Sequence, residues 1–175
     1  QPGPVLALDG AITALARGLQ APADGVEPVG RRHDAKRPAI FVLDEAHIYP
    51  DGGGYRLRGA SAQSVNLGRE NVVLGNGSNE IIELLCHTFL NRKTELIAAE
   101  HAFVVYKLMA TLFGATYVEV PDPGFVHDLD AMADAITADT RLVFIANPNN
   151  PTGTMVDQTA IDRFMARLPE HVIAV

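Results

Sequence analysis

One stretch decides the fold: LIAAEHAFVVYKLMATLFGATYVEV, residues 96–120. It opens with the apolar run Leu96–Ala99 and closes with a second one, Tyr117–Val120. Between the two runs, apolar residues recur at a spacing that places them on one face of an α-helix: Val105, Leu108, Met109 and Leu112. A helix between two strands is the crossover connection that a parallel pair of strands requires. The stretch therefore predicts a strand–helix–strand unit.

The same alternation continues on both sides of this unit. Further strand-like runs are Val72–Leu74, Leu142–Ala146 and Val172–Val175. Helical patterns lie between the runs, at Ile81, Ile82, Leu85 and Phe89, at Leu129, Met132 and Ile136, and at Ile161, Met165 and Leu168. The strand runs are apolar on both faces, as in a sheet that is covered on both sides. We therefore expect an α/β fold: a three-layer, mostly parallel sheet with helices on both faces.

The first 54 residues differ from the rest, because they contain many prolines and glycines. We expect residues 1–54 to form an amino-terminal arm and loop region and residues 55–175 to form the α/β domain. Within the arm, Asp9 is expected to cap a short helix. The apolar face of that helix is Ile12, Leu15, Ala16 and Leu19. Residues 40–43 form a candidate strand.

Composition narrows the class of protein. The chain has 175 residues with 14 basic and 21 acidic side chains, a net charge of −7, and 47 % hydrophobic residues. This balance is ordinary for a globular protein, and the acidic charge argues against nucleic acid as the main partner. The single cysteine, Cys86, fits a reducing compartment. With no membrane-length apolar run and no signal-peptide pattern, we expect a cytoplasmic protein that does not bind membranes.

The tetrapeptide DEAH at residues 44–47 matches a helicase motif. In an ATPase such an acidic pair needs a phosphate-binding loop of the form GxxxxGK[ST]. The chain has no such loop. We interpret the tetrapeptide as a coincidence, and a nucleotide titration would test the ATPase alternative.

A loop of glycines and polar residues, LGNGSNE at 74–80, lies between a predicted strand and a predicted helix. Gly75 and Gly77 allow the backbone to turn tightly, and Ser78 or Asn79 stands where the helix begins. Free N–H groups and the helix dipole make such a terminus an anion site. A capped helix after an ordinary loop explains the same residues equally well.

A second loop, NPNNPTG at 147–153, directly follows the predicted strand 142–146. Ligands of open parallel sheets bind beyond the carboxyl ends of the strands. The two prolines restrict the backbone, and the asparagine amides offer both donors and acceptors. A structural turn uses the same residue types, although this order of seven residues is unusual for a turn.

NPNNPTG resembles the signature loop of pyridoxal-phosphate (PLP) aminotransferases of the aspartate-aminotransferase fold type. Three further segments resemble the histidinol-phosphate aminotransferases within that group: IYPDGGGYRLR at 48–58, VVLGNGSNEIIELL at 72–85 and HAFVVYKL at 101–108. The resemblance covers residues 46–175 and implies PLP as the cofactor, with no metal. It also implies that histidinol phosphate and glutamate or 2-oxoglutarate exchange an amino group in histidine biosynthesis.

The resemblance also implies roles for single residues. Asn150 corresponds to the residue that hydrogen-bonds the 3-oxygen of the cofactor, and Phe103 to the aromatic residue that stacks on its ring. The phosphate group would be held at the start of the helix by Gly77, Ser78 and Asn79. Tyr49 corresponds to a tyrosine that reaches the phosphate in the neighbouring subunit, which implies a homodimer.

Several parts of the family pattern are missing from the chain. The aspartate that pairs with the pyridinium nitrogen and the lysine that forms a Schiff base with the cofactor are expected beyond Val175. No lysine of the chain (Lys36, Lys93 or Lys107) lies in a matching motif, and residues 1–45 lack the Asn-Glu-Asn-Pro segment of the family. We therefore expect the chain to be an amino-terminal part of a longer aminotransferase and to be inactive by itself.

Three alternatives remain at this point. Two are enzymes: an aromatic amino-acid aminotransferase, and a PLP decarboxylase that acts on a phosphorylated amino acid. The third is a non-catalytic module that keeps only the site for the cofactor phosphate. An intact mass well above 18.8 kDa for the native protein would favour an enzyme over the non-catalytic module.

Overall fold

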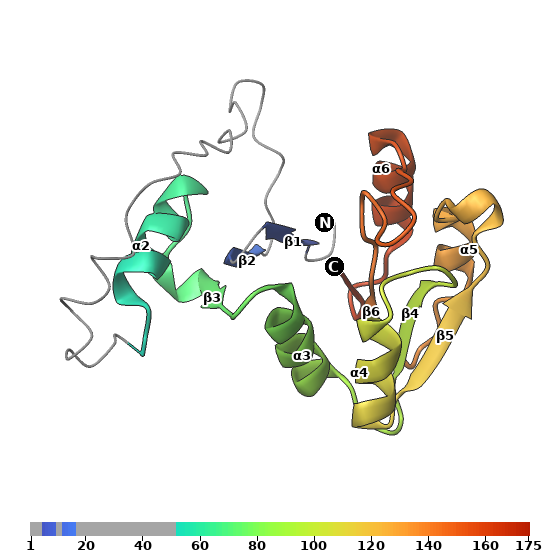
Figure 1. Cartoon of the computed structure of the whole chain (residues 1–175), viewed down its shortest axis with the longest axis horizontal. Helices are drawn as coiled ribbons and strands as arrows, with labels where there is room; N and C mark the ends of the chain where they lie inside the picture. The colour runs from blue at the N-terminus through green and yellow to red at the C-terminus, as the bar shows by residue number, and fades with distance from the viewer. Residues whose placement is uncertain (1–4, 10–11, 17–51) are drawn as a thin grey trace.

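The structure is a computed structural model that describes residues 5–9, 12–16 and 52–175, the first two ranges as backbone only. The strands are β1 (Val5–Asp9), β2 (Ile12–Ala16), β3 (Val72–Leu74), β4 (Glu95–Ala99), β5 (Thr116–Val120), β6 (Thr140–Val143) and β7 (Ile173–Ala174). The α-helices are α2 (Tyr55–Ser64), α3 (Ser78–Phe89), α4 (Val105–Phe113), α5 (Leu129–Asp134) and α6 (Gln158–Arg167). Two 3-10 helices, η1 (Arg69–Asn71) and η2 (Pro123–Phe125), precede β3 and α5 (Figure 1).

The described strands form one sheet in the order β3-β2-β1-β7-β6-β4-β5. Strands β7, β6, β4 and β5 are parallel, and β1 adds to them in parallel through Val5 and Ala174. The pairs β1–β2 and β2–β3 are antiparallel. The expectation of a mostly parallel α/β sheet is confirmed, and its carboxyl edge gathers the loops that follow β4, β5 and β6.

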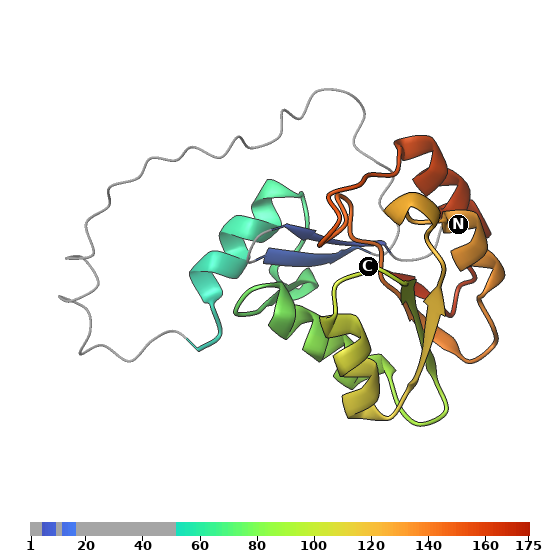
Figure 2. The same cartoon turned by 45° about the vertical axis from the view of Figure 1, so that its right-hand side comes forward.

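Both faces of the parallel part are covered by helices, as the apolar strands predict. On β4, Leu96 and Ala98 pack with α3 and α4, whereas Ile97 points to the other face and packs with α5 and α6. The same alternation occurs on β6, where Leu142 and Val143 belong to opposite clusters. Figures 1 and 2 show α3 and α4 on one side of β4 and α5 and α6 on the other.

Local sequence explains where these helices begin and end. Asp128 and Asp157 cap α5 and α6, because each carboxylate accepts a hydrogen bond from the backbone N–H three residues later, at 2.9 and 2.8 Å. Gly114 ends α4 in the left-handed conformation, with φ at 71°. None of the helices in the described ranges has the length and apolar character that a membrane span requires.

The expectation of a helix capped by Asp9 is wrong. Residues 12–16 form β2, which pairs with β1 on one side and with β3 on the other. The apolar residues suit a strand as well as a helix, and two neighbouring strands supply the hydrogen bonds that decide between them. Helix α2 was not predicted. The candidate strand at 40–43 lies outside the described residues, and the division of the chain after residue 54 stays a prediction.

Candidate functional site

A cavity of about 470 Å³ lies at the carboxyl edge of the sheet, against the start of α3. It brings together three of the residues that the sequence analysis selected: Ser78, Phe103 and Asn150. They come from α3, from the loop before α4 and from the loop after β6. Its other lining residues are Ile82, Tyr106, Phe144, Ile145, Ala146, Asn147, Pro148 and Val175. Residues far apart in the sequence therefore meet because parallel strands end at one edge.

The amino terminus of α3 forms one part of the cavity wall. Ser78 is the first helical residue, and no side chain of the described residues caps this end. Gly77 precedes it with φ at 80° and ψ at 179°, a conformation that only glycine adopts readily, while a Cβ there would meet open space. Gly77 and Asn79 lie beside the cavity without lining it. The unbonded N–H groups of the first turn leave this end able to bind an anion.

Glu80 lies in the first turn of α3, where its negative charge could oppose an anion. Its carboxylate is instead held by Asn76, whose backbone N–H and side-chain Nδ2 both donate to Oε2, the latter at 2.8 Å. The carboxylate thus turns back over the preceding loop and does not cap the first turn of α3.

Aromatic rings form the apolar wall of the cavity. The rings of Tyr106 and Phe144 stack with centroids 4.4 Å apart, and Phe103 meets Tyr106 edge-on at 5.8 Å. Tyr106 is buried, and its burial raises the pKa of the phenol to about 12, so the ring stays neutral. Phe103 is half-buried and reaches both the core and the cavity. Tyr106 was missed as a site residue, although it follows Phe103 by only three residues in the sequence.

The three asparagines of the loop after β6 have different surroundings. The Asn147 side chain makes two hydrogen bonds to the backbone of Val156: Nδ2 donates to the carbonyl at 3.0 Å, and Oδ1 accepts from the N–H at 3.1 Å. Asn149 is buried and donates to the carbonyl of His101 at 3.0 Å and to Thr152 Oγ1 at 2.9 Å. Asn150 is exposed, lines the cavity and makes no side-chain hydrogen bond to the described residues. Asn150 is therefore the asparagine available to a ligand.

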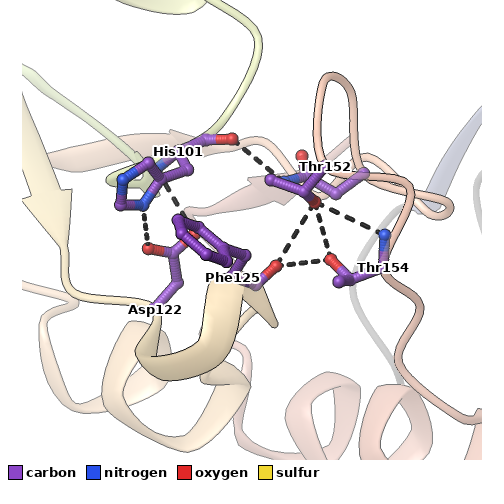
Figure 3. A network of polar contacts seen from close by, with 6 residues as sticks. His101, Asp122, Phe125, Thr152 and Thr154 are labelled. Atoms are coloured by element: carbon purple, nitrogen blue, oxygen red, sulfur yellow. Dashed lines mark hydrogen bonds and ion pairs between the residues drawn. The ribbon is translucent and has the colours of Figure 1, made fainter.

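A polar network joins His101 and Asp122 to the loop that carries Asn150 (Figure 3). His101 Nδ1 donates to Asp122 Oδ1 at 2.7 Å, and the His101 backbone N–H donates to Oδ2 at 3.3 Å. The pKa of His101 is raised above its ordinary value, chiefly by this hydrogen bond. Across the loop, His127 Nε2 donates to the carbonyl of Ala146 at 3.0 Å, and burial lowers the pKa of His127. The two histidines thus favour opposite charge states.

The remaining reactive groups of the described residues lie elsewhere. Lys107 pairs with Glu119 at 3.0 Å, and neither Lys93 nor Lys107 lines the cavity. Cys86 is fully buried in α3, and burial raises the pKa of its thiol to about 12. Tyr49, Lys36 and the tetrapeptide at 44–47 lie outside the described residues.

Comparison with known proteins gives a consistent result. The family described as Aminotransferase class I and II matches residues 32–175. A histidinol-phosphate aminotransferase of Akkermansia muciniphila is 47 % identical over 154 residues, which are 87 % of this chain and 42 % of that protein. The protein of the same name from Moorella thermoacetica is 41 % identical over 87 % of the chain and 40 % of its own length. The chain thus spans about two fifths of the length of these relatives.

Solved structures resemble the fold. The histidinol-phosphate aminotransferase from Sinorhizobium meliloti, determined in complex with pyridoxal 5′-phosphate, gives a TM-score of 0.70 at 20 % identity. That match covers 77 % of this chain and 37 % of the other. An aminotransferase from Escherichia coli gives a TM-score of 0.67 at 26 % identity, over 77 % and 37 % of the two chains. The α/β architecture described above is thus the one that these proteins share.

Proposed function

Because the chain belongs to the class I and II aminotransferases, we propose that it forms part of the cofactor-binding domain of a PLP-dependent histidinol-phosphate aminotransferase. The reaction would exchange an amino group between histidinol phosphate and 2-oxoglutarate in histidine biosynthesis. The identity of 47 % to a protein of that name supports the substrate pair. The cavity at the carboxyl edge supports the cofactor, because it unites the three kinds of group that PLP needs.

The residues of the cavity fit PLP in three respects. An uncapped helix terminus with Ser78 at its first position suits the phosphate. The aromatic wall, with Phe103 at the cavity, suits a flat ring. The free amide of Asn150 suits an oxygen substituent on that ring. A volume of about 470 Å³ lies within the range of small-molecule sites.

Each of these residues has a distinct task in this proposal. The N–H groups at the start of α3 and the Ser78 hydroxyl bind the phosphate and fix one end of the cofactor. Phe103 stacks on the ring and excludes water from one face. Asn150 donates from Nδ2 to the 3-oxygen, which withdraws electron density from the ring. Tyr106 stays neutral behind Phe103, so the wall remains apolar at physiological pH.

PLP, when bound, supplies the electron sink for the carbanion that forms when the amino donor loses a proton. The described residues orient the ring for that chemistry, but their two lysines lie away from the cavity. We therefore propose that the 175-residue chain alone binds the cofactor without transamination. A group with an accessible amine, supplied by the larger enzyme, would move the proton.

The observation that carries this proposal is the meeting of Ser78, Phe103 and Asn150 around one cavity. The test is an assay of the protein that contains this chain, with histidinol phosphate and 2-oxoglutarate as substrates and PLP present. We expect glutamate to form with histidinol phosphate and not with phenylalanine. Turnover of phenylalanine alone would replace the substrate assignment with the aromatic alternative. Release of carbon dioxide from a phosphorylated amino acid, supplied in place of histidinol phosphate, would favour a decarboxylase.

A homodimer is part of the same proposal, since the resemblance places Tyr49 at a neighbouring subunit. The described residues offer a surface for it on α4. Val104, Leu108 and Leu112 follow one another at four-residue spacing and are 60 %, 56 % and 66 % exposed. This apolar row begins one residue after Phe103, so a second copy seated there would lie beside the cavity. We also propose that the enzyme acts in the cytoplasm, where the one cysteine of this chain, Cys86, stays reduced.

A further inference from the structure

We propose that Asp122 is a positioning residue, which acts through His101 and Asn149 to hold Phe103 and Asn150 at the cavity. The inference rests on the proposed function, because Phe103 and Asn150 need a fixed separation only if both contact the same ligand. A continuous chain of hydrogen bonds from Asp122 to the loop of Asn150 carries the argument.

The sheet register explains why these residues meet. Strands β4 and β5 are parallel, and Ala99 lies opposite Val120. His101 and Asp122 each stand two residues beyond that pair, at the same height above the sheet. Strand β6 flanks β4 on its other side, and the loop of Asn149 follows it. Three neighbouring parallel strands thus deliver the three residues to one edge.

Asp122 is unusual because its carboxylate is completely buried, with a side-chain exposure of 0 %. Burial of a carboxylate is costly unless the oxygens are hydrogen-bonded. Both oxygens bond to His101: Oδ1 accepts from the ring at 2.7 Å and Oδ2 from the backbone N–H at 3.3 Å. This double contact fixes the backbone of His101 as well as its side chain.

The chain of contacts continues from His101 into the next loop. The His101 carbonyl accepts a hydrogen bond from Asn149 Nδ2 at 3.0 Å. Asn149 is itself 3 % exposed, and its backbone N–H donates to the carbonyl of Thr154 at 2.8 Å. Asp122 and Asn149 therefore hold the N–H and the carbonyl of His101 from two sides.

The consequence falls on the two residues that face the cavity. Phe103 is two positions after His101, so the clamp on His101 fixes the start of the segment that carries its ring. Asn150 directly follows Asn149 and lines the cavity, while Asn149 is buried. One hydrogen-bond network thereby fixes the positions of both the Phe103 ring and the Asn150 amide.

Phe125 also contacts members of this network, through its backbone carbonyl and its ring. It has φ at 63°, a strained value for a residue with a bulky side chain. Its carbonyl accepts hydrogen bonds from Thr152 Oγ1, at 3.3 Å, and from Thr154 Oγ1. Its ring meets the ring of His101 edge-on at 4.8 Å. Phe125 therefore connects the loop after β5 to the threonines in the loop after β6, as Figure 3 shows.

The charges near His101 agree with a hydrogen-bonded pair. Asp122, Glu100 and Glu119 all favour its protonated form, and Glu119 is also paired with Lys107. Glu100, His101 and Asp122 offer three ligand atoms within 4.8 Å of one another, as a metal site would. The 2.7 Å between Nδ1 and Oδ1 is a hydrogen-bond distance, so a proton held between the two atoms accounts for their approach.

The test uses the protein that contains this chain, labelled for NMR, and the probe 4′-deoxypyridoxine 5′-phosphate, which has no aldehyde and therefore forms no Schiff base with a lysine. The variants are Asp122→Asn, which removes one acceptor from the buried pair, and His101→Gln. Asp130→Asn is the control, because it makes the same chemical change in an exposed pair with Arg163 and Arg167.

We expect the signals of the Phe103 ring and the Asn150 side-chain amide to follow the titration of His101 in the wild-type protein. In Asp122→Asn this coupling should disappear, and the probe should bind about tenfold more weakly, since a hydrogen bond to a charged group is lost. Asp130→Asn should match the wild type in both respects.

The outcomes separate the two proposals. If the wild-type protein shows the coupling but does not bind the probe, the cofactor assignment fails and the positioning role stands. If the probe binds and neither the coupling nor the affinity changes in Asp122→Asn, the positioning role is overturned. A variant that loses the native spectrum altogether makes Asp122 a folding residue, which also overturns the inference, and His101→Gln then checks that conclusion independently.

Discussion

The ring of Tyr106 lies nearly parallel to the ring of Phe144, at an interplanar angle of 12° and a centroid distance of 4.4 Å. The pair joins α4 to the segment after β6, and both side chains also line the cavity. This contact therefore belongs both to the core and to the cavity wall. We expect a change here to lower the stability of the fold more than it weakens ligand binding.

Tyr106→Ala should lower the free energy of unfolding by about 3–5 kcal/mol, because it leaves a cavity beneath the stacked ring. Tyr106→Phe should cost less than about 1.5 kcal/mol, since the volume is kept and no hydrogen bond of the hydroxyl to a described residue is lost. Urea denaturation of the two variants measures the difference. Equal losses would mean that the hydroxyl, and not the ring, makes the important contact.

The loop asparagines should separate stability from binding. Asn147→Ala removes two hydrogen bonds to Val156 and should cost about 1–2 kcal/mol of stability. Asn150→Ala should change stability by less than about 0.5 kcal/mol and weaken binding of 4′-deoxypyridoxine 5′-phosphate. Thermal unfolding and a probe titration of both variants supply the comparison. The assignment of Asn150 fails if its variant binds the probe as the wild type does.

Gly77→Ala tests the backbone before α3. A Cβ would meet open space, so the penalty comes from φ at 80° with an extended ψ, and we expect a loss of about 1–3 kcal/mol. Gly52→Ala is the matched control, because that position is also open and lacks a positive φ. Denaturation midpoints of the two variants should therefore differ clearly. A neutral Gly77→Ala would show that the turn can rearrange.

Stability should depend on pH through His101. Its raised pKa means that the native chain holds the proton more tightly than the unfolded chain does. The stabilisation is then fully present below the ordinary pKa of 6.5 and is lost as the pH rises through the native pKa. Unfolding measured from about pH 6 to about pH 8.5 should show a steeper decline for the wild type than for His101→Gln or Asp122→Asn. Parallel curves would contradict the coupling of His101 to Asp122.

The apolar row on α4 gives a prediction about assembly. We expect the purified chain to be a dimer and Leu108→Glu to be a monomer, because a charge in an apolar interface is costly to bury. Light scattering after size-exclusion chromatography measures the mass. Thr159→Glu adds the same charge to an exposed position on α6 and should remain dimeric. A wild-type chain that is monomeric at high concentration would remove α4 as the interface.

Sequence patterns predicted most of the parallel part of the fold for a physical reason. The run at 96–99 is apolar on both faces, and such a strand needs helices on both sides, which α3, α4, α5 and α6 provide. The segment 12–16 was assigned wrongly because its helical spacing says nothing about the strands beside it. Only the pairing with β1 and β3 makes it a strand.

The site was harder to predict than the fold. The sequence alone marks three asparagines in one loop, yet their tasks depend on which backbone groups lie opposite, such as Val156 for Asn147. Asp122 was not selected at all. It is 21 residues from His101, and the two meet only through the register of β4 and β5.

Because Cys86 is buried, the rate at which its thiol reacts reports how often α3 opens. Its thiol is sealed inside α3 and against the sheet, so an alkylating reagent reaches it only when that helix opens. As the one cysteine of the chain, it gives a single labelling rate without background. Because α3 also presents Ser78 to the cavity, a ligand with a phosphate group that binds at the start of α3 should slow the labelling of Cys86.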